Sequence, residues 1–221
     1  MRRSINRAID SVELSKIFHE IRNPLTLINS SLQLIQDEHP EVKDFQYWNQ
    51  TMEDIKNLRV LLEEISDLQK GDALKIRLVN LFDFTEDLIE STAGFLFENG
   101  TSLKLECNIT YLDFHADEAK LRQAVINLLK NAAESTVSGK PIHLKITAVE
   151  STLAIIVEDH GCGMTKEDLK EIFKPFHTTK PFGTGLGLPI VKKIVEAHQG
   201  LIAVDSIPGE GTTVGIYLPI I

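Results

Sequence analysis

The chain has 221 residues, of which 43% are hydrophobic and 25% charged, and its formal net charge is −9. This composition is that of a globular protein with one large domain or two modest ones, and it excludes a disordered or fibrous chain. The negative charge argues against nucleic-acid binding, and the apolar runs are too short to enter a membrane. Cys107 and Cys162 match neither a disulfide framework nor a zinc site, so we expect a reducing, cytosolic environment.

The first third of the chain is patterned for two helices. Apolar residues recur at alternating spacings of four and three through residues 14–35, as in a heptad seam, and a second seam with spacings of three or four follows through 45–65. Pro40 blocks helix continuation between the seams, and Lys70–Gly71 suits the end of the second. We therefore expect residues 1–72 to form an antiparallel hairpin. Because a lone hairpin buries too little, two copies are expected to close a four-helix bundle as a homodimer.

From about residue 73 the heptads give way to short segments rich in β-branched residues. These predict strands at 75–81, 102–109, 142–150, 152–160, 201–206 and 212–219, with helices between them at about 82–98, 117–136 and 187–199. Asp117 is suited to cap the start of the second helix, and Gly200 the end of the third. We therefore expect residues 73–221 to form a separate two-layer α/β domain, with the boundary near Gly71.

The segment FHEIRNPLT holds the first candidate for chemistry. Helix geometry places His19 at the edge of the apolar seam, about 100° from Phe18, with Glu20 adjacent and Asn23 one turn further on. Pro24 is expected to loosen the helix locally. A histidine beside a carboxylate can act as a nucleophile whose proton Glu20 removes or whose tautomer it fixes. The alternative is an ordinary surface histidine.

Two asparagines lie inside an otherwise apolar helical stretch, LRQAVINLLKNAAES. Asn127 and Asn131 are four residues apart and so share one helix face. Two amide oxygens one turn apart can bind a hard cation such as Mg²⁺ together with phosphate oxygens and water. Because asparagine is a poor helix former, the presence of two inside one helix favours a functional role. The alternatives are solvated amides or a helix cap.

Glycines follow two further segments. In VEDHGCGM, Asp159 ends a strand and could accept a hydrogen bond from an amine such as adenine N6, while Gly161 and Gly163 let the backbone approach a flat ring. The alternative is an ordinary turn. In GTGLGLPI, three glycines lead into a helix whose N–H groups suit phosphate, namely Gly183, Gly185 and Gly187. The spacing fits neither a Walker A loop nor the Rossmann fingerprint, and eukaryotic-type protein kinase motifs are missing.

The stretch IFKPFHTTKPF lies between these two glycine segments. It combines three phenylalanines and two prolines with Lys174 and Lys180. This composition is typical of a mobile cover over a site. The alternatives are a surface loop anchored by buried phenylalanines and a capped helix start.

The motifs in this order resemble the catalytic core of a two-component sensor histidine kinase. FHEIRNPLT resembles the H box, NLLKNAAES the N box, VEDHGCGM the G1 box, IFKPFHTTK the F box and GTGLGLPI the G2 box. The resemblance extends from about residue 10 to the end. It implies an α+β multidomain fold, in which residues 1–72 are a dimerisation and histidine phosphotransfer domain and residues 73–221 an ATP-binding domain of the Bergerat type.

The resemblance also implies roles for residues of the hairpin. His19 would be the phospho-accepting nucleophile and Glu20 its general base. Asn23 matches the position that orients water when such kinases dephosphorylate their regulator. ATP would be the phosphoryl donor, with Mg²⁺ as its metal.

In the second domain, Asn131 would be the main magnesium ligand with Asn127 beside it, and Asp159 would hold the adenine amine. The other residues implied in nucleotide binding are Lys130, Gly161, Gly163, Thr178, Lys180, Gly183, Gly185, Gly187 and Thr212. Thr178 and Lys180 would belong to a lid over the nucleotide. Thr212 would support a water network on the adenine side.

Two positions refine this implication. ATPases of the same fold carry a water-activating glutamate where this chain has Asn127, so the asparagine favours a kinase over an ATPase. Many family members have a basic residue where this chain has Glu134, and Lys130 or a lid lysine would then contact phosphate. The N-box and lid sequences are most similar to those of sporulation sensor kinases of spore-forming bacteria.

The resemblance implies partners beyond a second copy of the chain. A response regulator receiver domain would accept the phosphoryl group on an aspartate, and a protein inhibitor that grips the hairpin is a further candidate. Only 18 residues precede His19, so we expect a cytoplasmic fragment of a longer sensor, for which a membrane anchor is one arrangement. No contact of this fragment with a membrane or nucleic acid is expected.

Three alternatives of other classes fit the sequence less well. A catalytically silent phosphotransfer or scaffold protein should have lost the nucleotide motifs, yet all are present. A stand-alone ATPase should carry the N-box glutamate and lack the hairpin. A coiled-coil interaction module would leave residues 73–221 without a role.

Overall fold

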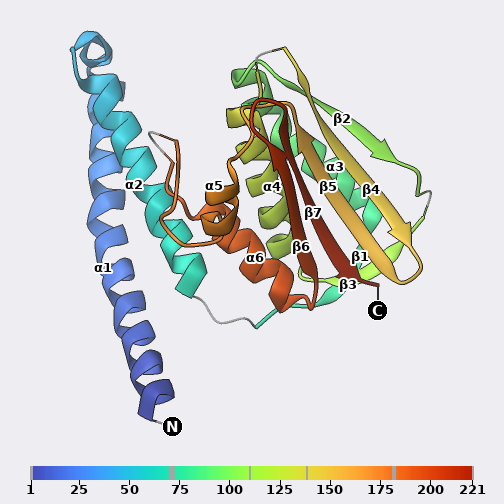
Figure 1. The fold of residues 1–221 in the computed structure, drawn as a ribbon. Helices are drawn as coiled ribbons and strands as arrows, with labels where there is room; N and C mark the ends of the chain where they lie inside the picture. The colour runs from blue at the N-terminus through green and yellow to red at the C-terminus, as the bar shows by residue number, and fades with distance from the viewer. Residues whose placement is uncertain (1, 70–72, 110, 138, 181–182, 221) are drawn as a thin grey trace. The chain divides into compact units, whose positions relative to one another are not determined.

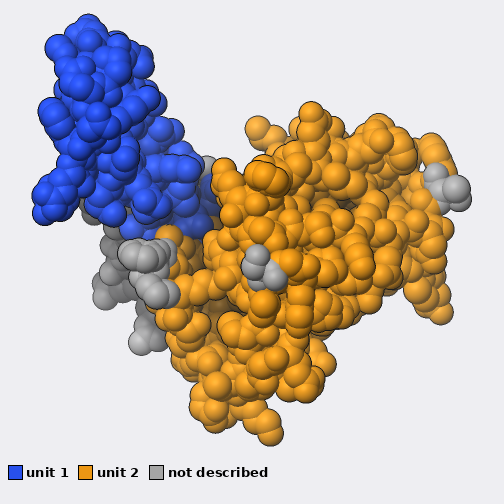
Figure 2. All heavy atoms as spheres, turned by 90° about the horizontal axis from the view of Figure 1, so that it is seen from above, with its two compact units in different colours: residues 1–71 blue, residues 72–221 orange. Residues whose placement is uncertain are grey.

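The computed structural model describes residues 2–69, 73–109, 111–137, 139–180 and 183–220, with side chains from Glu20 onward. The chain divides into two compact units, residues 1–71 and 72–221, coloured blue and orange in Figure 2. Among the described helices, none is long and apolar enough to cross a membrane.

The first unit is the expected helical hairpin (Figure 1). Helix α1 (Arg2–Glu38) leads through the short 3-10 helix η1 (Pro40–Asp44) to α2 (Trp48–Gln69). The indole N–H of Trp48 donates to Gln36 Oε1 at 3.2 Å, which joins the two helices near the loop. Pro24 lies inside α1 without ending it. The expected cap at Lys70–Gly71 lies outside the described residues.

The heptad seams of the hairpin divide into a buried and an exposed set. The buried set lies between α1 and α2 and consists of Leu25, Ile55 and Leu62, with Leu32 packed against it. The exposed set on α1 recurs every seven residues and consists of Ile21, Ile28 and Ile35, whose exposed fractions are 45%, 49% and 41%. The seam therefore supplies two apolar stripes, of which the hairpin itself covers one.

The second unit contains helices and strands in alternation (Figure 1). In chain order they are β1 (Arg77–Asn80), α3 (Leu81–Glu98), β2 (Ser102–Cys107), β3 (Asp113–Ala116), α4 (Glu118–Ser135), β4 (Pro141–Val149), β5 (Thr152–Asp159), α5 (Lys166–Glu171), α6 (Gly187–Ala197), β6 (Leu201–Ile207) and β7 (Gly211–Pro219). The sequence pattern predicted all of them except β3 and α5.

A mixed five-stranded sheet forms one layer of this unit, in the order β2-β4-β5-β7-β6. β2 runs parallel to β4, and the other neighbours are antiparallel. Helices α3, α4 and α6 contact the sheet, and alternate residues of β4 are buried beneath them, namely Ile142, Leu144 and Ile146. β1 and β3 form a separate antiparallel pair. The predicted α/β sheet-and-helix layers are thereby confirmed.

The helix caps confirm one prediction and correct another. The Asp117 carboxylate accepts the N–H of Lys120 at 3.2 Å and caps α4 as expected. Gly200 is not the residue that turns the chain after α6, because Gln199 adopts the left-handed conformation with φ of 59°. The N–H of Gly200 then bonds to Val195 O, as in a Schellman motif. Gly200 is needed for space, since a Cβ there would lie 2.6 Å from Tyr217 O.

Candidate functional site

Asp159 lies at the carboxyl end of β5, the central strand of the sheet, and is 8% exposed. Its Oδ1 accepts the N–H of Gly161 at 2.8 Å. Burial raises the pKa of Asp159, although hydrogen bonds from the backbone of Gly161 and Thr212 act in the opposite direction. A buried acceptor that the following loop holds in place can recognise an amine through a hydrogen bond shielded from water.

Thr212 pairs with Asp159 across β5 and β7, and its hydroxyl lies 2.8 Å from Ser206 Oγ. Ser206 also donates to Gly211 O at 3.0 Å and accepts the N–H of Met164 at 2.9 Å. The serine thus joins the loop after Asp159 to the β6–β7 hairpin. Sequence reasoning missed Ser206, although the tight hairpin between the last two strands places it opposite Thr212.

The loop after Asp159 is also attached to the end of α4. Gly161 forms an isolated β-bridge with Thr136, and a Cβ at Gly161 would collide with the carbonyl of Ser135. Gly163 has a φ of 64° in the same loop. The glycine at 161 is therefore required by close backbone approach. This contact joins the loop after Asp159 to α4, the helix that carries the predicted magnesium residues.

The predicted magnesium residues lie on the half-exposed face of α4. Asn127 and Asn131 are both partly buried, and a Cβ built on Gly187 would lie 3.6 Å from Asn131 Nδ2 and 3.9 Å from Oδ1. Gly187 is the first residue of α6, so the asparagine amide rests against the glycine-rich helix start. Lys130 is exposed on the same helix.

The segment between α5 and α6 carries Thr178, Lys180, Gly183 and Gly185. Thr178 Oγ1 accepts the N–H of Lys180 at 3.1 Å in a local turn. Gly185 has a φ of 68°, and its carbonyl accepts the N–H of Phe176 at 3.0 Å, so the segment folds back on itself. We call residues 172–180 and 183–186 the lid segment.

The lid segment contacts α4 through Lys180. The ammonium of Lys180 lies 2.6 Å from Glu134 Oε2 and donates to Asn131 O at 3.3 Å. A lid lysine, one of the two lysine sources predicted for a phosphate contact, therefore lies beside the backbone of the predicted magnesium residue Asn131.

The hairpin candidates belong to the first unit. Glu20 and Asn23 are exposed on α1, as expected for residues beside the apolar seam. The side chain of His19 lies outside the described residues. The roles of all three stay predictions.

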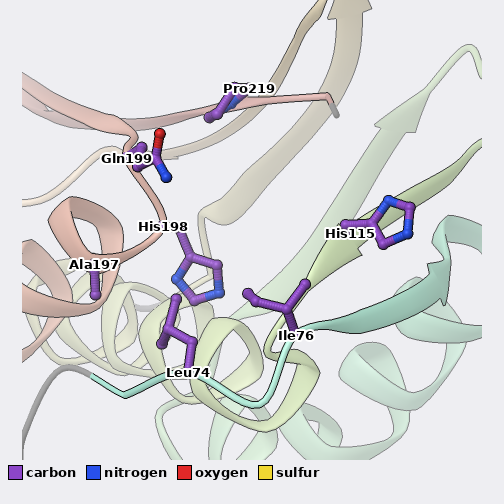
Figure 3. Close-up of a pocket in the computed structure, with 7 residues that line it drawn as sticks. All are labelled: Leu74, Ile76, His115, Ala197, His198, Gln199 and Pro219. Atoms are coloured by element: carbon purple, nitrogen blue, oxygen red, sulfur yellow. The ribbon is translucent and has the colours of Figure 1, made fainter.

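A separate cavity of about 530 Å³ in the second unit (Figure 3) is lined by Leu74, Ile76, His115, Ala197, His198, Gln199 and Pro219. His198 Nε2 accepts the N–H of Asp117 at 3.0 Å, and Nδ1 donates to Ile194 O at 2.7 Å. Both ring nitrogens thus serve the fold, and His198 is a structural histidine. We do not place the functional site in this cavity.

Comparison with known proteins gives two family matches. Residues 11–74 match the His Kinase A (phospho-acceptor) domain, and residues 116–221 match the histidine kinase-, DNA gyrase B- and HSP90-like ATPase. Sporulation kinase C of Bacillus subtilis is 33% identical over 99% of this chain and 51% of its own length. Sporulation kinase A of the same bacterium is 35% identical over 92% of this chain and 33% of its own length. The chain thus spans about half or less of these relatives.

Among solved structures, the crystal structure of full-length ShkA in complex with AMPPNP has a TM-score of 0.82. The two proteins are 23% identical, and the match covers 94% of this chain and 45% of ShkA. This likeness shows the fold.

Proposed function

Because the chain belongs to the histidine kinase family, with a phospho-acceptor domain followed by an ATPase-type domain, we propose that it phosphorylates its own His19 from ATP. The phosphoryl group then passes to an aspartate of a response regulator. The observation that carries the proposal is the convergence of Asp159, Asn131 and Lys180 on one site, from β5, α4 and the lid segment. No observation favours the catalytically silent alternative.

Residues 73–221, which belong to the second unit, are the proposed ATP domain. Asp159 would accept the adenine amine, with Gly161 and Gly163 below the ring and Thr212 supporting the acid. The phosphate side would be formed by Lys130, Thr178, Lys180, Gly183, Gly185 and Gly187. The buried carboxylate of Asp159 and the close approach of Gly161 to α4 support this assignment.

The amide oxygens of Asn131 and Asn127 are the groups that would hold Mg²⁺. Carboxamide oxygen is a suitable ligand for this hard cation, and the Asn131 amide lies close to Gly187 at a helix start suited to phosphate. When bound, the ion would neutralise charge on the β- and γ-phosphates. Asn127 in place of a carboxylate leaves the site without a base that would activate water, which favours transfer to a histidine.

In the hairpin, residues 1–72, a ring nitrogen of His19 would form the new N–P bond as the bond between the γ-phosphorus and the β–γ bridging oxygen breaks. ADP leaves, and Glu20 accepts the proton that the ring loses. Asn23 would orient water for dephosphorylation of the regulator. Both Glu20 and Asn23 are exposed, as these roles require.

We further propose a homodimer in which two hairpins form a four-helix bundle. The exposed stripe of Ile21, Ile28 and Ile35 supports it, because apolar residues at heptad spacing favour a partner helix. The receiver domain would dock on this bundle, and an inhibitor that grips the hairpin would block transfer. The chain would be the cytoplasmic core of a longer sensor in a sporulation-type pathway.

The test is autophosphorylation with γ-labelled ATP and Mg²⁺ on wild type and His19→Gln. We expect acid-labile label on the wild type, as a phosphoramidate gives, and none on the variant. His39→Gln is the matched control, since His39 is an exposed histidine of the same hairpin, and it should keep the label. Label that survives acid, or that persists in His19→Gln, would contradict the proposal.

A further inference from the structure

The C-terminal end of α4 is negatively charged, and it binds a lysine from a distant part of the chain. The last turn of α4 contains Glu134 and no basic residue. Helix carbonyls at a C-terminus carry partial negative charge, so a cation is favoured there. Lys180, 46 residues from Glu134 and 49 from Asn131, supplies that cation through the contacts at 2.6 and 3.3 Å.

This ion pair lies beside the proposed magnesium residue. Lys180 bonds to the backbone carbonyl of Asn131, while the Asn131 amide rests against Gly187 at the start of α6. The lysine therefore stands next to the place proposed for the phosphates. The side chains of Lys180 and Glu134 are 33% and 51% exposed. A pair with this exposure is weak, so Lys180 can exchange one anion for another at small cost.

We propose that Glu134 is a positioning residue, which holds Lys180 and thereby the lid segment on α4 while no nucleotide is bound. When a nucleoside triphosphate binds, its terminal phosphate replaces Glu134 as the partner of the lysine. The inference rests on the proposed function of the site. A terminal phosphate carries more negative charge than a carboxylate, and the flexible lysine stem can turn its three donors toward it. Glu134 thus competes with the nucleotide, and a triphosphate overcomes that competition better than a diphosphate.

The first test measures MgATP and MgADP affinity calorimetrically for wild type and Glu134→Gln in the full chain. Glutamine keeps the size of the side chain and removes the competing charge. We expect MgATP to bind about three- to fivefold more tightly, the scale of a partly exposed ion pair, and MgADP to change by less than about twofold. Unchanged or weaker MgATP binding would overturn the proposal.

A double-mutant cycle separates competition for Lys180 from simple removal of a negative charge near phosphate. Lys180→Met should weaken MgATP binding. In this background, Glu134→Gln should change the logarithm of the MgATP affinity by less than about half as much as it does in the wild type. If Glu134→Gln tightens MgATP binding equally in both backgrounds, the lysine is not involved and the inference is wrong.

Glu171→Gln is the matched control. Glu171 also pairs with a lysine of the lid segment, Lys174, but the pair is local at i and i+3. This variant should leave both affinities unchanged, and an equal gain in MgATP affinity would overturn a specific role for Glu134. Failure of the proposed function gives a different result, because the wild type would then bind no MgATP or acquire no acid-labile label.

Discussion

At the scale of single residues, Asp159 is a buried acid in the proposed nucleotide site. Its carboxyl is buried, and burial raises its pKa. A carboxyl whose pKa is raised on folding adds stability below its unfolded pKa of about 3.8 and loses it as the pH rises through the folded value. At neutral pH the ionised group therefore costs stability, which is a common feature of functional sites.

We predict that Asp159→Asn stabilises the second unit and impairs nucleotide binding. The amide oxygen can still accept the N–H of Gly161, while the buried charge is removed. The midpoint temperature of thermal unfolding at neutral pH should therefore rise by about 2–4 °C. MgATP affinity should fall by about tenfold or more, because a charge-assisted bond to the adenine amine is weakened. Circular dichroism melts and calorimetry measure both. Asp205→Asn, at an exposed acid of β6, should change neither.

The same prediction has a pH signature. As the pH falls below the ordinary aspartate value of 3.8, wild-type Asp159 becomes neutral in both states, so the stability gain of Asp159→Asn should vanish. A gain that persists at strongly acid pH would contradict the proposed cause.

At the scale of elements, the start of α4 is hydrogen-bonded to two other parts of the second unit. At its start, the Asp117 carboxylate accepts the N–H groups of Lys75 and Lys120, at 2.8 and 3.2 Å, and the Asp117 N–H donates to His198 at the end of α6. Burial acts to raise the pKa of Asp117, but the two backbone hydrogen bonds and nearby positive charge outweigh it and hold the pKa below its usual value. The cap thus also anchors the segment before β1.

We predict that Asp117→Ala destabilises the second unit by about 1–2 kcal/mol at neutral pH, as loss of an N-cap does. Because the pKa is lowered on folding, the contribution of the ionised carboxylate is present above its unfolded pKa and is lost as the pH falls through the folded value. The penalty should therefore shrink at strongly acid pH. Urea unfolding followed by circular dichroism measures it.

Asn80→Ala provides the control for this pH dependence. Asn80 caps α3 through the N–H groups of Phe82 and Asp83, and its amide does not titrate. Because that amide also donates to Asp113 Oδ1 at 2.8 Å, the control is made in an Asp113→Asn background. Its penalty should be similar at both pH values. If the Asp117→Ala penalty is also constant, the stabilisation does not depend on the ionised carboxylate.

At the scale of the whole molecule, the two units differ in how completely they bury their apolar residues. The second unit encloses a core between its sheet and its helices, with Leu121, Leu144 and Ile155 at 0% exposure. The hairpin covers one of the two stripes of α1, and the three buried residues between α1 and α2 keep exposed fractions of 7–9%. This asymmetry favours a second copy as the cover of the hairpin.

We predict that Ile28→Glu weakens the dimer by about a hundredfold or more, because a charge would be buried in the bundle. Sedimentation of the full chain should then show monomers that still bind MgATP. Ser30→Glu, at an exposed position on another side of α1, should remain dimeric. A wild type that is monomeric at high concentration, or a dimeric Ile28→Glu, would contradict the bundle.

The sequence alone was sufficient for features that depend on neighbours along the chain. The heptad spacing predicted both hairpin helices, and the chemistry of Asp117 predicted its cap. Five ordered motifs indicated the family. The sequence pattern did not predict two short elements. β3 has four residues, and each pairs with a residue of β1 that lies 33 to 39 positions earlier. α5 has only six residues, too few to show a periodicity.

Only the tertiary structure decided which apolar stripe of α1 the hairpin covers, which residue turns the chain after α6, and how Ser206 joins the loop after Asp159. It also brought Lys180 to Glu134. Local propensity and periodicity act over one or two turns, so a sequence expresses them directly. Ion pairs and hydrogen bonds between distant segments depend instead on the packing of the whole unit, and that packing determines the partner of each polar group in the candidate site.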